Sequence, residues 1–486
     1  MTRVLAASPI GVASFIAALA IASLAVEAGL VPSDTLSLWA GSIIAGDGQQ
    51  SIGRIVAAYP TIPFMATSAL EFFAPAGTPV PALLAAALVG LIAALWFVAF
   101  RKSGLNVFVA GIATALLAFH PALLRAAIAG PSEMLVVLFM FMFGNALFDL
   151  RERCAAPEVM AVSLALLGLA FSHPMGAAFA CAAVPFLVFA VRPVLVRNSA
   201  FNVVLVLVFP TVFAVGAFSY VSWVFPGDGW SFYSAPSQSL TAWTIGVSQI
   251  FGGGLTGNLI IDASLGFATA LLMGAPLAAV AAYRVRQRRP LLAPPAVLAA
   301  TTIGAVAISV GTGLFGDPAA VAVAAPVLCA VVIIRIPPAR ENAGIMLGLL
   351  LLGWFGGALA LTLIDPRAAS RFTGFEIALG HERVDALDLG HALAKRNGVI
   401  VDTDNAPAVV VGRSYARGLI TPSDEQFTFA ILLSRIDTPY VAVPDPHSAT
   451  GAQDRIVRAF PLLYQNGTGG YRLVYQNATW RLYARN

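Results

Sequence analysis

The sequence predicts a mainly α-helical, polytopic membrane protein of about 11 spans with a small C-terminal extracytoplasmic α/β domain. Of its 486 residues, 59% are hydrophobic and 11% are charged, and the mean hydropathy is +0.84. These values lie far outside the range of soluble globular domains. Long apolar runs recur through the first 363 positions, whereas the remaining positions have the composition of an ordinary soluble domain. A wholly soluble protein is therefore excluded.

Membrane spans are predicted from the length of the apolar runs. A helix needs about 20 mostly apolar residues to cross the hydrocarbon core. The first run, Val4 to Leu30, has no polar cleavage region and is expected to remain as a span rather than be removed. We expect His173-Pro174 to divide the stretch Ala161 to Ala190 into two short helices. The predicted spans are centred near residues 17, 90, 113, 140, 166, 184, 212, 272, 302, 327 and 353.

The basic residues predict the orientation of these spans. Lys and Arg in short loops are retained on the cytoplasmic side of a membrane. The basic clusters fall in every second predicted loop, at Arg101-Lys102, Arg151 to Arg153, Arg192 to Arg197, Arg284 to Arg289 and Arg335 to Arg340. We therefore expect a cytoplasmic N-terminus and, with an odd number of spans, a periplasmic or extracellular C-terminal domain. The alanine-rich composition favours a bacterial inner (plasma) membrane.

Charge density predicts two domains. Residues 1–363 contain 27 charged side chains, and residues 364–486 contain 25. We place the transmembrane domain at residues 1–364 and an α/β domain at residues 365–486. Within the second domain the patterns predict helices at Val384 to Arg396 and Pro422 to Leu433, strands at Val399 to Asp402, Val409 to Val411 and Tyr440 to Val443, and a hairpin of Tyr471 to Tyr475 with Thr479 to Ala484.

Several classes of function are disfavoured. The net charge of +4 comes from basic and acidic side chains spread along the chain without a dense basic patch, so no nucleic-acid partner is expected. The cysteines Cys154, Cys181 and Cys329 form no CxxC pair, which argues against a disulfide framework or a thiolate zinc site. Glycine-rich nucleotide-binding motifs are absent from any strand-to-helix context.

Ionisable groups near the outer ends of the predicted spans are the candidates for chemistry, because such groups are costly to desolvate. Asp34 follows the first span directly, where a carboxylate is well placed to act as a general base or a metal ligand. It could equally cap the next helix. Residues 37–58 have apolar positions at helical spacing and are expected to form an amphipathic helix along the membrane interface.

The second outer loop gathers three ionisable groups, His120, Arg125 and Glu133. Glu133 is a candidate catalytic acid, although Ser132 could cap the helix and Glu133 could simply favour its N-terminus. Likewise, His173 could be a structural histidine and Trp230 part of an interfacial aromatic belt. The predicted substrate-binding residues are Arg54, Tyr59, His120, Arg125, His173, Trp230 and Tyr233.

A family resemblance rests on these residues. The first outer loop, with Asp34, Asp47 and Tyr59-Pro60-Thr61-Ile62-Pro63, resembles that of the GT-C superfamily of membrane glycosyltransferases, which use polyprenyl-phosphate sugars. Gly130-Pro131-Ser132-Glu133 at a helix start and the overall architecture resemble the same superfamily. The resemblance implies that Asp34 is the catalytic base or a metal-associated residue, with Asp47 in reserve, and that Glu133 is the acid opening the helix after the second outer loop.

The implied reaction transfers a sugar from a polyprenyl-phosphate donor to an envelope glycan or lipid acceptor. Asp34 would take the proton of the acceptor hydroxyl, and Arg54, Arg125 or His120 would neutralise the departing phosphate. Thr35 follows Asp34, so the paired acids of some family members are missing and a divalent metal is left open. Two alternatives also stay open: a lipid-linked glycan transporter or flippase, and a non-catalytic subunit of an envelope polysaccharide assembly complex.

Overall fold

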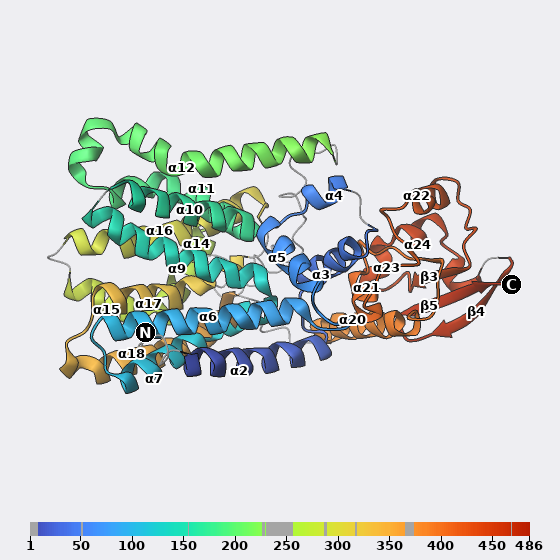
Figure 1. Cartoon of the computed structure of the whole chain (residues 1–486), viewed down its shortest axis with the longest axis horizontal. Coiled ribbons are helices and arrows are strands. Elements are labelled where there is room, and N and C mark those ends of the chain that lie inside the picture. The colour runs from blue at the N-terminus through green and yellow to red at the C-terminus, as the bar shows by residue number, and fades with distance from the viewer. Residues whose placement is uncertain are drawn as a thin grey trace. The chain divides into compact units, whose positions relative to one another are not determined.

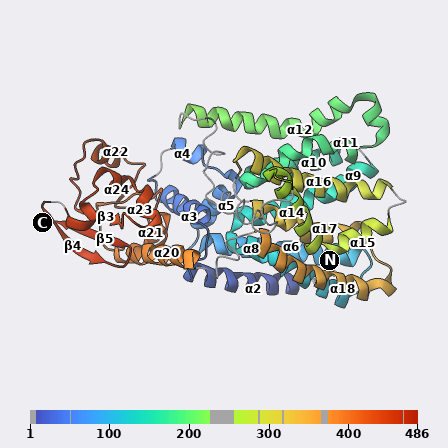
Figure 2. The same cartoon turned by 180° about the vertical axis from the view of Figure 1, so that it is seen from behind.

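The structure is a computed structural model that describes residues 8–49, 52–153, 155–225, 229, 256–285, 289–315, 318–364, 374–467 and 469–486. The described part of the chain is mainly helical and carries a small sheet near the C-terminus (Figures 1 and 2). The chain divides into two compact units. We call residues 1–22, 59–62 and 84–370 the helical bundle, and residues 23–58, 63–83 and 371–486 the α/β unit.

Apolar helices account for most of the bundle, and they identify the chain as a membrane-spanning protein. Among the described residues, seven helices are long and apolar enough to cross a membrane, or up to nine if each of two bent pairs is one span. The count of 11 is not confirmed and stays a prediction. All described helices of the bundle, whether or not they are candidate spans, are α2 (Ser8–Glu27), α6 (Val80–Lys102), α7 (Val107–Ala118), α8 (Pro121–Ala129), α9 (Pro131–Glu152), α10 (Ala156–Ser172), α11 (Pro174–Ala190), α12 (Pro193–Val224), α14 (Leu259–Gly274), α15 (Pro276–Arg284), α16 (Arg289–Thr312), η1 (Pro318–Val323), α17 (Ala324–Arg335), η2 (Arg340–Asn342) and α18 (Ala343–Ile364).

Each predicted span centre lies in one of these helices, but four of them fall in helices that are short or bent. The predicted break at His173 is confirmed, because α10 ends at Ser172 and α11 begins at Pro174. Proline has no amide hydrogen to donate and disfavours helical geometry in the residue before it, so it starts a new helix. The pair α7 and α8 bends by 54°, and the pair α14 and α15 bends by 84°.

The α/β unit is built on a five-stranded sheet of order β2-β1-β3-β5-β4. The three strands β2, β1 and β3 at one end of this order are parallel, and β5 is antiparallel to both of its neighbours, β3 and β4. The predicted closing hairpin is confirmed as β4 and β5. The strands are β1 (Val399–Ile400), β2 (Leu419–Ile420), β3 (Tyr440–Pro444), β4 (Tyr471–Gln476) and β5 (Trp480–Arg485).

Helices cover both faces of this sheet because side chains alternate along each strand. Val399 and Val401 join a core with α20 (Gly374–Ala392) and α21 (Pro407–Arg413), whereas Ile400 joins a second core. The second core is closed by α22 (Glu425–Leu432), α24 (Arg455–Ala459) and α25 (Leu463–Asn466), and the short helix α23 (Ala449–Gln453) precedes α24. The result is a three-layer α/β arrangement.

One predicted strand is wrong. Val409 to Val411 belongs to helix α21, whose residues are all buried. A short apolar run does not distinguish a buried strand from a buried helix. Here α20 and α21 cross closely at glycines, since a Cβ on Gly390 would lie 2.4 Å from the carbonyl oxygen of Val409. This close crossing leaves the valines no solvent-facing side, which removes the helical periodicity from the sequence.

The first loop of the chain contributes to the core of the α/β unit. It forms α3 (Ser33–Gly46), α4 (Ile52–Val56) and α5 (Thr61–Glu71). Leu36, Trp39 and Ile43 of α3 are at most 5% exposed and pack with residues of α20, α21 and the sheet. The predicted interfacial helix over residues 37–58 is therefore wrong for α3, because protein covers its apolar face. Burial stabilises by roughly 1.5–3 kcal/mol for each large apolar side chain.

This shared core restricts the topology. Segments that pack into one core lie on the same side of a membrane, so the chain must cross an even number of times between α3 and the sheet. After α3 the described residues provide six long apolar helices, or eight with both bent pairs, and both numbers are even. The predicted boundary after residue 364 borders on residues outside the described part and stays a prediction.

Leu36→Ala tests the packing of α3. We expect it to lower the free energy of unfolding of the α/β unit by about 2–5 kcal/mol, because it leaves a cavity in the shared core. Pulse proteolysis of the full chain in urea, followed through a C-terminal tag, measures the change. Ser37→Ala, at an exposed position of the same helix, is the control. Equal midpoints for the two variants would show that α3 is not part of this core.

Cysteine labelling tests the shared side of the membrane. In a cysteine-free chain, Ser37→Cys on α3 and Lys395→Cys after α20 both introduce exposed thiols. We expect a membrane-impermeant maleimide to label both from the same side of sealed vesicles. Arg153→Cys, in a basic loop where the side chain is 72% exposed, should react from the opposite side. Labelling of the first two positions from opposite sides would contradict the common core.

Candidate functional site

Asp34 lies in the first turn of α3 and is exposed. The N-cap residue is Pro32, in an extended conformation, and it makes no side-chain cap hydrogen bond. Asp34 is therefore not the helix cap that the sequence offered as an alternative. A carboxylate in the first turn is favoured by the partial positive charge of the helix N-terminus. Because the opposite face of α3 is buried, Asp34 is carried by a fixed element.

Asp47 closes the other end of α3 and has structural partners. Its Oδ2 accepts a 2.6 Å hydrogen bond from the amide of Ala416, and its Oδ1 lies 3.3 Å from Nε of Arg417. The carboxylate thus joins the end of α3 to the segment that follows α21. These contacts account for Asp47 without a catalytic role.

Glu71, at the end of α5, was not among the predicted site residues. Burial raises the pKa of Glu71 to about 7, the nearby indole of Trp39 opposes this rise, and the charge of Asp47 adds to it. Neither Oε2 of Glu71 nor Nε1 of Trp39 has a hydrogen-bond partner of ordinary geometry among the described residues. A carboxyl group with a pKa near neutrality suits general acid or base chemistry. In the sequence, only its place in the first loop pointed to it.

In the helical bundle, Arg125 and Glu133 form a buried ion pair. Nη1 of Arg125 lies 2.6 Å from Oε2 of Glu133, and the two side chains are 10% and 8% exposed. Gly130, with φ +112°, makes the sharp turn between α8 and α9 that lets them meet. The N-cap of α9 is Gly130, so the expectation that Ser132 caps this helix is wrong. Breaking such a pair strands a buried charge and costs about 3–5 kcal/mol.

The two predicted histidines of the bundle both cap helices. Nδ1 of His173 accepts a 3.0 Å hydrogen bond from the amide of Met175, and Arg125 acts on this ring electrostatically. Nδ1 of His120 accepts from the amide of Ala122, so its Nε2 carries the proton and donates to the carbonyl of Gly353 at 3.2 Å. The fold thus brings Arg125, Glu133 and His173 together. Both ring nitrogens of His120 are engaged in hydrogen bonds to the backbone.

The remaining predicted binding residues are placed only in part. The hydroxyl of Tyr59 donates a 2.9 Å hydrogen bond to the carbonyl of Ala170 in the bundle. Arg54 lies in α4, but its side chain is outside the described part of the structure, and Trp230 and Tyr233 lie outside the described residues. The predictions for these three residues stay predictions.

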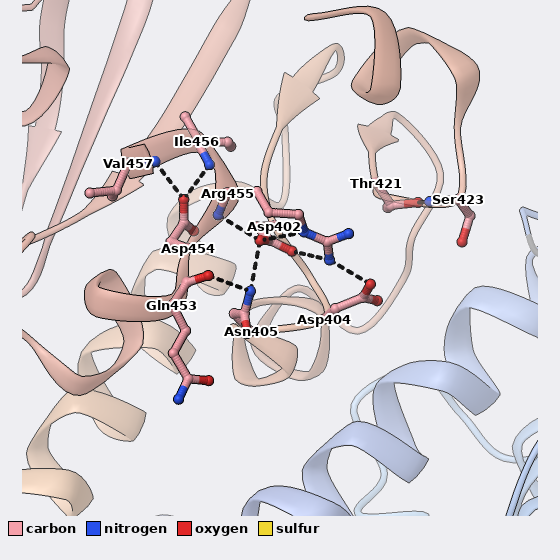
Figure 3. Close-up of polar contacts among 10 residues, drawn as sticks. All are labelled: Asp402, Asp404, Asn405, Thr421, Ser423, Gln453, Asp454, Arg455, Ile456 and Val457. Carbon is pink, nitrogen blue, oxygen red and sulfur yellow. Dashed lines mark hydrogen bonds and ion pairs between the residues drawn. The ribbon is translucent and has the colours of Figure 1, made fainter. Parts of the chain in front are cut away.

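A polar network that sequence reasoning did not single out lies where β1 ends (Figure 3). Asp402 is fully buried and accepts hydrogen bonds from Arg455 through its backbone amide at 3.0 Å, Nε at 3.0 Å and Nη2 at 2.9 Å, and from Asn405 at 2.8 Å. Asp404, 47% exposed, lies 2.6 Å from the same guanidinium. These bonds tie the loop after β1 to the start of α24.

The position of this network is one where α/β domains commonly bind ligands. Strand β1 is flanked by β2 on one side and β3 on the other, so the chain reverses direction across the sheet at this point. Crevices at the carboxyl ends of such strands are frequent binding sites. Here, however, both oxygens of the Asp402 carboxylate already accept hydrogen bonds, from Arg455 and Asn405. An acid as the last residue of the predicted strand Val399 to Asp402 was the signal that could have drawn attention to it.

Asp454, beside this network, has a buried carboxylate oxygen without a hydrogen-bond partner among the described residues. Its Oδ1 caps α24 by accepting from the amides of Ile456 and Val457 at 2.8 and 2.9 Å, whereas Oδ2 is buried without a partner. Burial raises the pKa of Asp454 to about 7, its cap hydrogen bonds and Arg455 oppose this rise, and the charge of Asp402 adds to it. The group therefore titrates near neutral pH.

Comparison with known proteins returned no matching family model and no matching curated protein. Within the part of the chain that the structure describes, no group of three or more His, Cys, Asp or Glu side chains is arranged to hold a metal ion. The functional argument therefore rests on the residues themselves.

Asp454→Asn tests the titration in this network. The pKa of Asp454 is about 7 in the folded chain and has an ordinary value of 3.8, so between these pH values the folded state keeps a proton that the unfolded state releases. Stability should therefore fall as pH rises from about 4 to about 7. The amide of asparagine still caps α24 and does not ionise, so the variant should lose this dependence.

Urea midpoints of the full chain between pH 5 and pH 8 measure the effect. The control is Asp437→Asn, because Asp437 is half exposed and is paired with Arg435 at the surface. The wild-type chain and the control should share the same fall in stability up to about pH 7. An equally steep fall in Asp454→Asn would show that another group titrates.

Proposed function

We propose that the chain is an integral-membrane, inverting glycosyltransferase. It moves a sugar from a polyprenyl-phosphate donor to an envelope glycan or lipid acceptor on the outer face of a bacterial inner membrane. The observation that carries the proposal is the placement of Asp34: an exposed carboxylate in the first turn of a helix whose other face is buried, following directly on the apolar helix α2. A catalytic group is most effective when a rigid element positions it.

The reaction is a single displacement at the anomeric carbon. Asp34 accepts the proton of the acceptor hydroxyl while the new glycosidic bond forms and the bond to the donor phosphate breaks. Negative charge builds on the departing phosphate, which an arginine neutralises best through paired hydrogen bonds. Arg54 and Arg125 are the candidates for this role. Apolar surfaces of the helical bundle suit the polyprenyl chain.

The proposed topology has 11 spans, a cytoplasmic N-terminus and a periplasmic or extracellular α/β unit. It is supported by the alternation of basic loops and by the common core of α3 and the sheet. Eleven is reached when α10 and α11, each of 17 residues, count as separate short spans alongside the bent pairs. One span, α2, precedes α3, so a total of 11 leaves an even number of spans between α3 and the sheet. An even number keeps both on the same side of the membrane.

Two other functions use the same architecture. A transporter or flippase of a lipid-linked glycan would need no base at Asp34. A non-catalytic assembly subunit fits the observation that Asp47, Glu133 and Asp402 are all engaged in structural contacts. A test of Asp34 separates these alternatives from the enzyme.

Asp34→Asn is the test of the proposed base. We expect the rate of sugar transfer to fall by about 10²–10⁴-fold, because the amide does not accept a proton. The assay follows transfer of radiolabelled sugar from polyprenyl-phosphate donors in membranes that contain the full chain. Asp47→Asn is the matched control on the same helix: it should lower stability through the lost contact with Arg417 while the folded fraction keeps its specific activity.

Glu71→Gln distinguishes between the two candidate bases of the first loop, Asp34 and Glu71. If Asp34→Asn retains full transfer activity and Glu71→Gln loses it, the base is Glu71 and the assignment of Asp34 is wrong. If both variants keep the wild-type rate, the enzymatic proposal fails and the assembly subunit is the better description.

A further inference from the structure

One end of the helical bundle contains an apolar cavity of about 190 Å³. It lies between α15, the end of α17 and the start of α18, and α15 contacts both of the other two helices (Figures 1 and 2). Its volume exceeds that of the engineered apolar cavity of about 150 Å³ that accommodates a benzene molecule. The cavity can therefore hold part of a hydrocarbon chain.

The position of the cavity is that of a membrane–water boundary. The candidate spans α17 and α18 end and begin here, separated by the turn Pro337-Pro338-Ala339 and η2. Helix α15 is bent by 84° from α14, so it does not continue the direction of that apolar helix. A short helix at a steep angle to a span, with exposed Tyr283 near its end, is typical of an interfacial segment.

The lining of the cavity is amphipathic. Side chains such as Leu277, Val332 and Met346 form an apolar wall, whereas Arg284 and Asn342 supply polar groups. Arg284 is exposed and forms no ion pair with any other residue that the structure describes. Arg335, at the end of α17, is by contrast neutralised by both oxygens of Asp149 at 2.7 and 2.8 Å. Arg284 thus remains as a charge for a ligand.

We infer that this cavity binds an anionic phospholipid, with an acyl chain between α15, α17 and α18 and the phosphate headgroup at Arg284. A free phosphate would use the arginine but leave the apolar wall uncovered, whereas a lipid matches both. In the sequence, Arg286, Arg288 and Arg289 follow within five residues of Arg284, so Arg284 belongs to a basic stretch of the chain. Basic pockets between membrane helices are suited to anionic headgroups. This inference is independent of the proposed transferase activity.

Native mass spectrometry of the full chain in detergent tests the site with dioleoylphosphatidylglycerol as the probe and dioleoylphosphatidylcholine as the neutral lipid. We expect a saturable phosphatidylglycerol adduct that the neutral lipid does not match. Arg284→Gln should weaken it about fivefold, the contribution of one arginine to headgroup attraction, while Arg284→Lys should stay within about twofold of wild type. Arg153→Gln, in another basic loop and 72% exposed, is the matched control and should bind as wild type does.

A second variant tests the acyl chain. Ile345 lines the cavity and is 53% exposed, so Ile345→Trp can narrow the cavity without disturbing the core. We expect it to weaken phosphatidylglycerol binding while competition by inorganic phosphate remains slight. Unchanged lipid binding in this variant, full competition by inorganic phosphate, or equal loss in Arg284→Gln and Arg153→Gln would each overturn the lipid site.

Discussion

Burial of the apolar face of α3 against α21 and the C-terminal sheet constrains both the fold of the α/β unit and the path of the chain. Leu36, Trp39 and Ile43 complete a core whose members outside the first loop follow more than 300 residues later. The hydrophobic effect makes separation of these surfaces costly, so the first loop and the sheet share one aqueous compartment. The chain must therefore cross the membrane an even number of times between the first loop and the sheet.

The same contact explains how the acids of the first loop differ. Asp47 is held by the amide of Ala416 and by Arg417, so its charge serves the junction between α3 and the C-terminal residues. Asp34 lies one helix length earlier and is exposed. Glu71 is partly buried beside Trp39, which places its pKa near neutrality. Three carboxyl groups of one loop thus have three environments, and only the environment distinguishes a structural acid from a chemical one.

Within the bundle, polar side chains satisfy backbone groups at helix breaks. His120 and His173 each accept from an amide at the start of a helix, where the first N–H groups have no intrahelical partner. Gly357 lies so close to the His120 ring that a Cβ at this position would be 2.5 Å from the ring. A buried polar group without a partner is costly in an apolar environment, so these contacts help to fix where α7, α8, α10 and α11 bend or end.

The amino-acid sequence by itself determined the class of the protein and the position of its helices. Apolar length and periodicity are local properties, so each predicted span centre lies in a helix, and the break at His173-Pro174 and the hairpin of β4 and β5 are also local. Tertiary structure decided what depends on distant partners. The valines of α21 form a helix because α3 and α20 enclose them. The Asp402 carboxylate is engaged because Arg455, 53 residues later in the chain, donates hydrogen bonds to it. Partners so far apart along the chain leave no pattern in a single sequence, since packing, rather than local preference, brings them together.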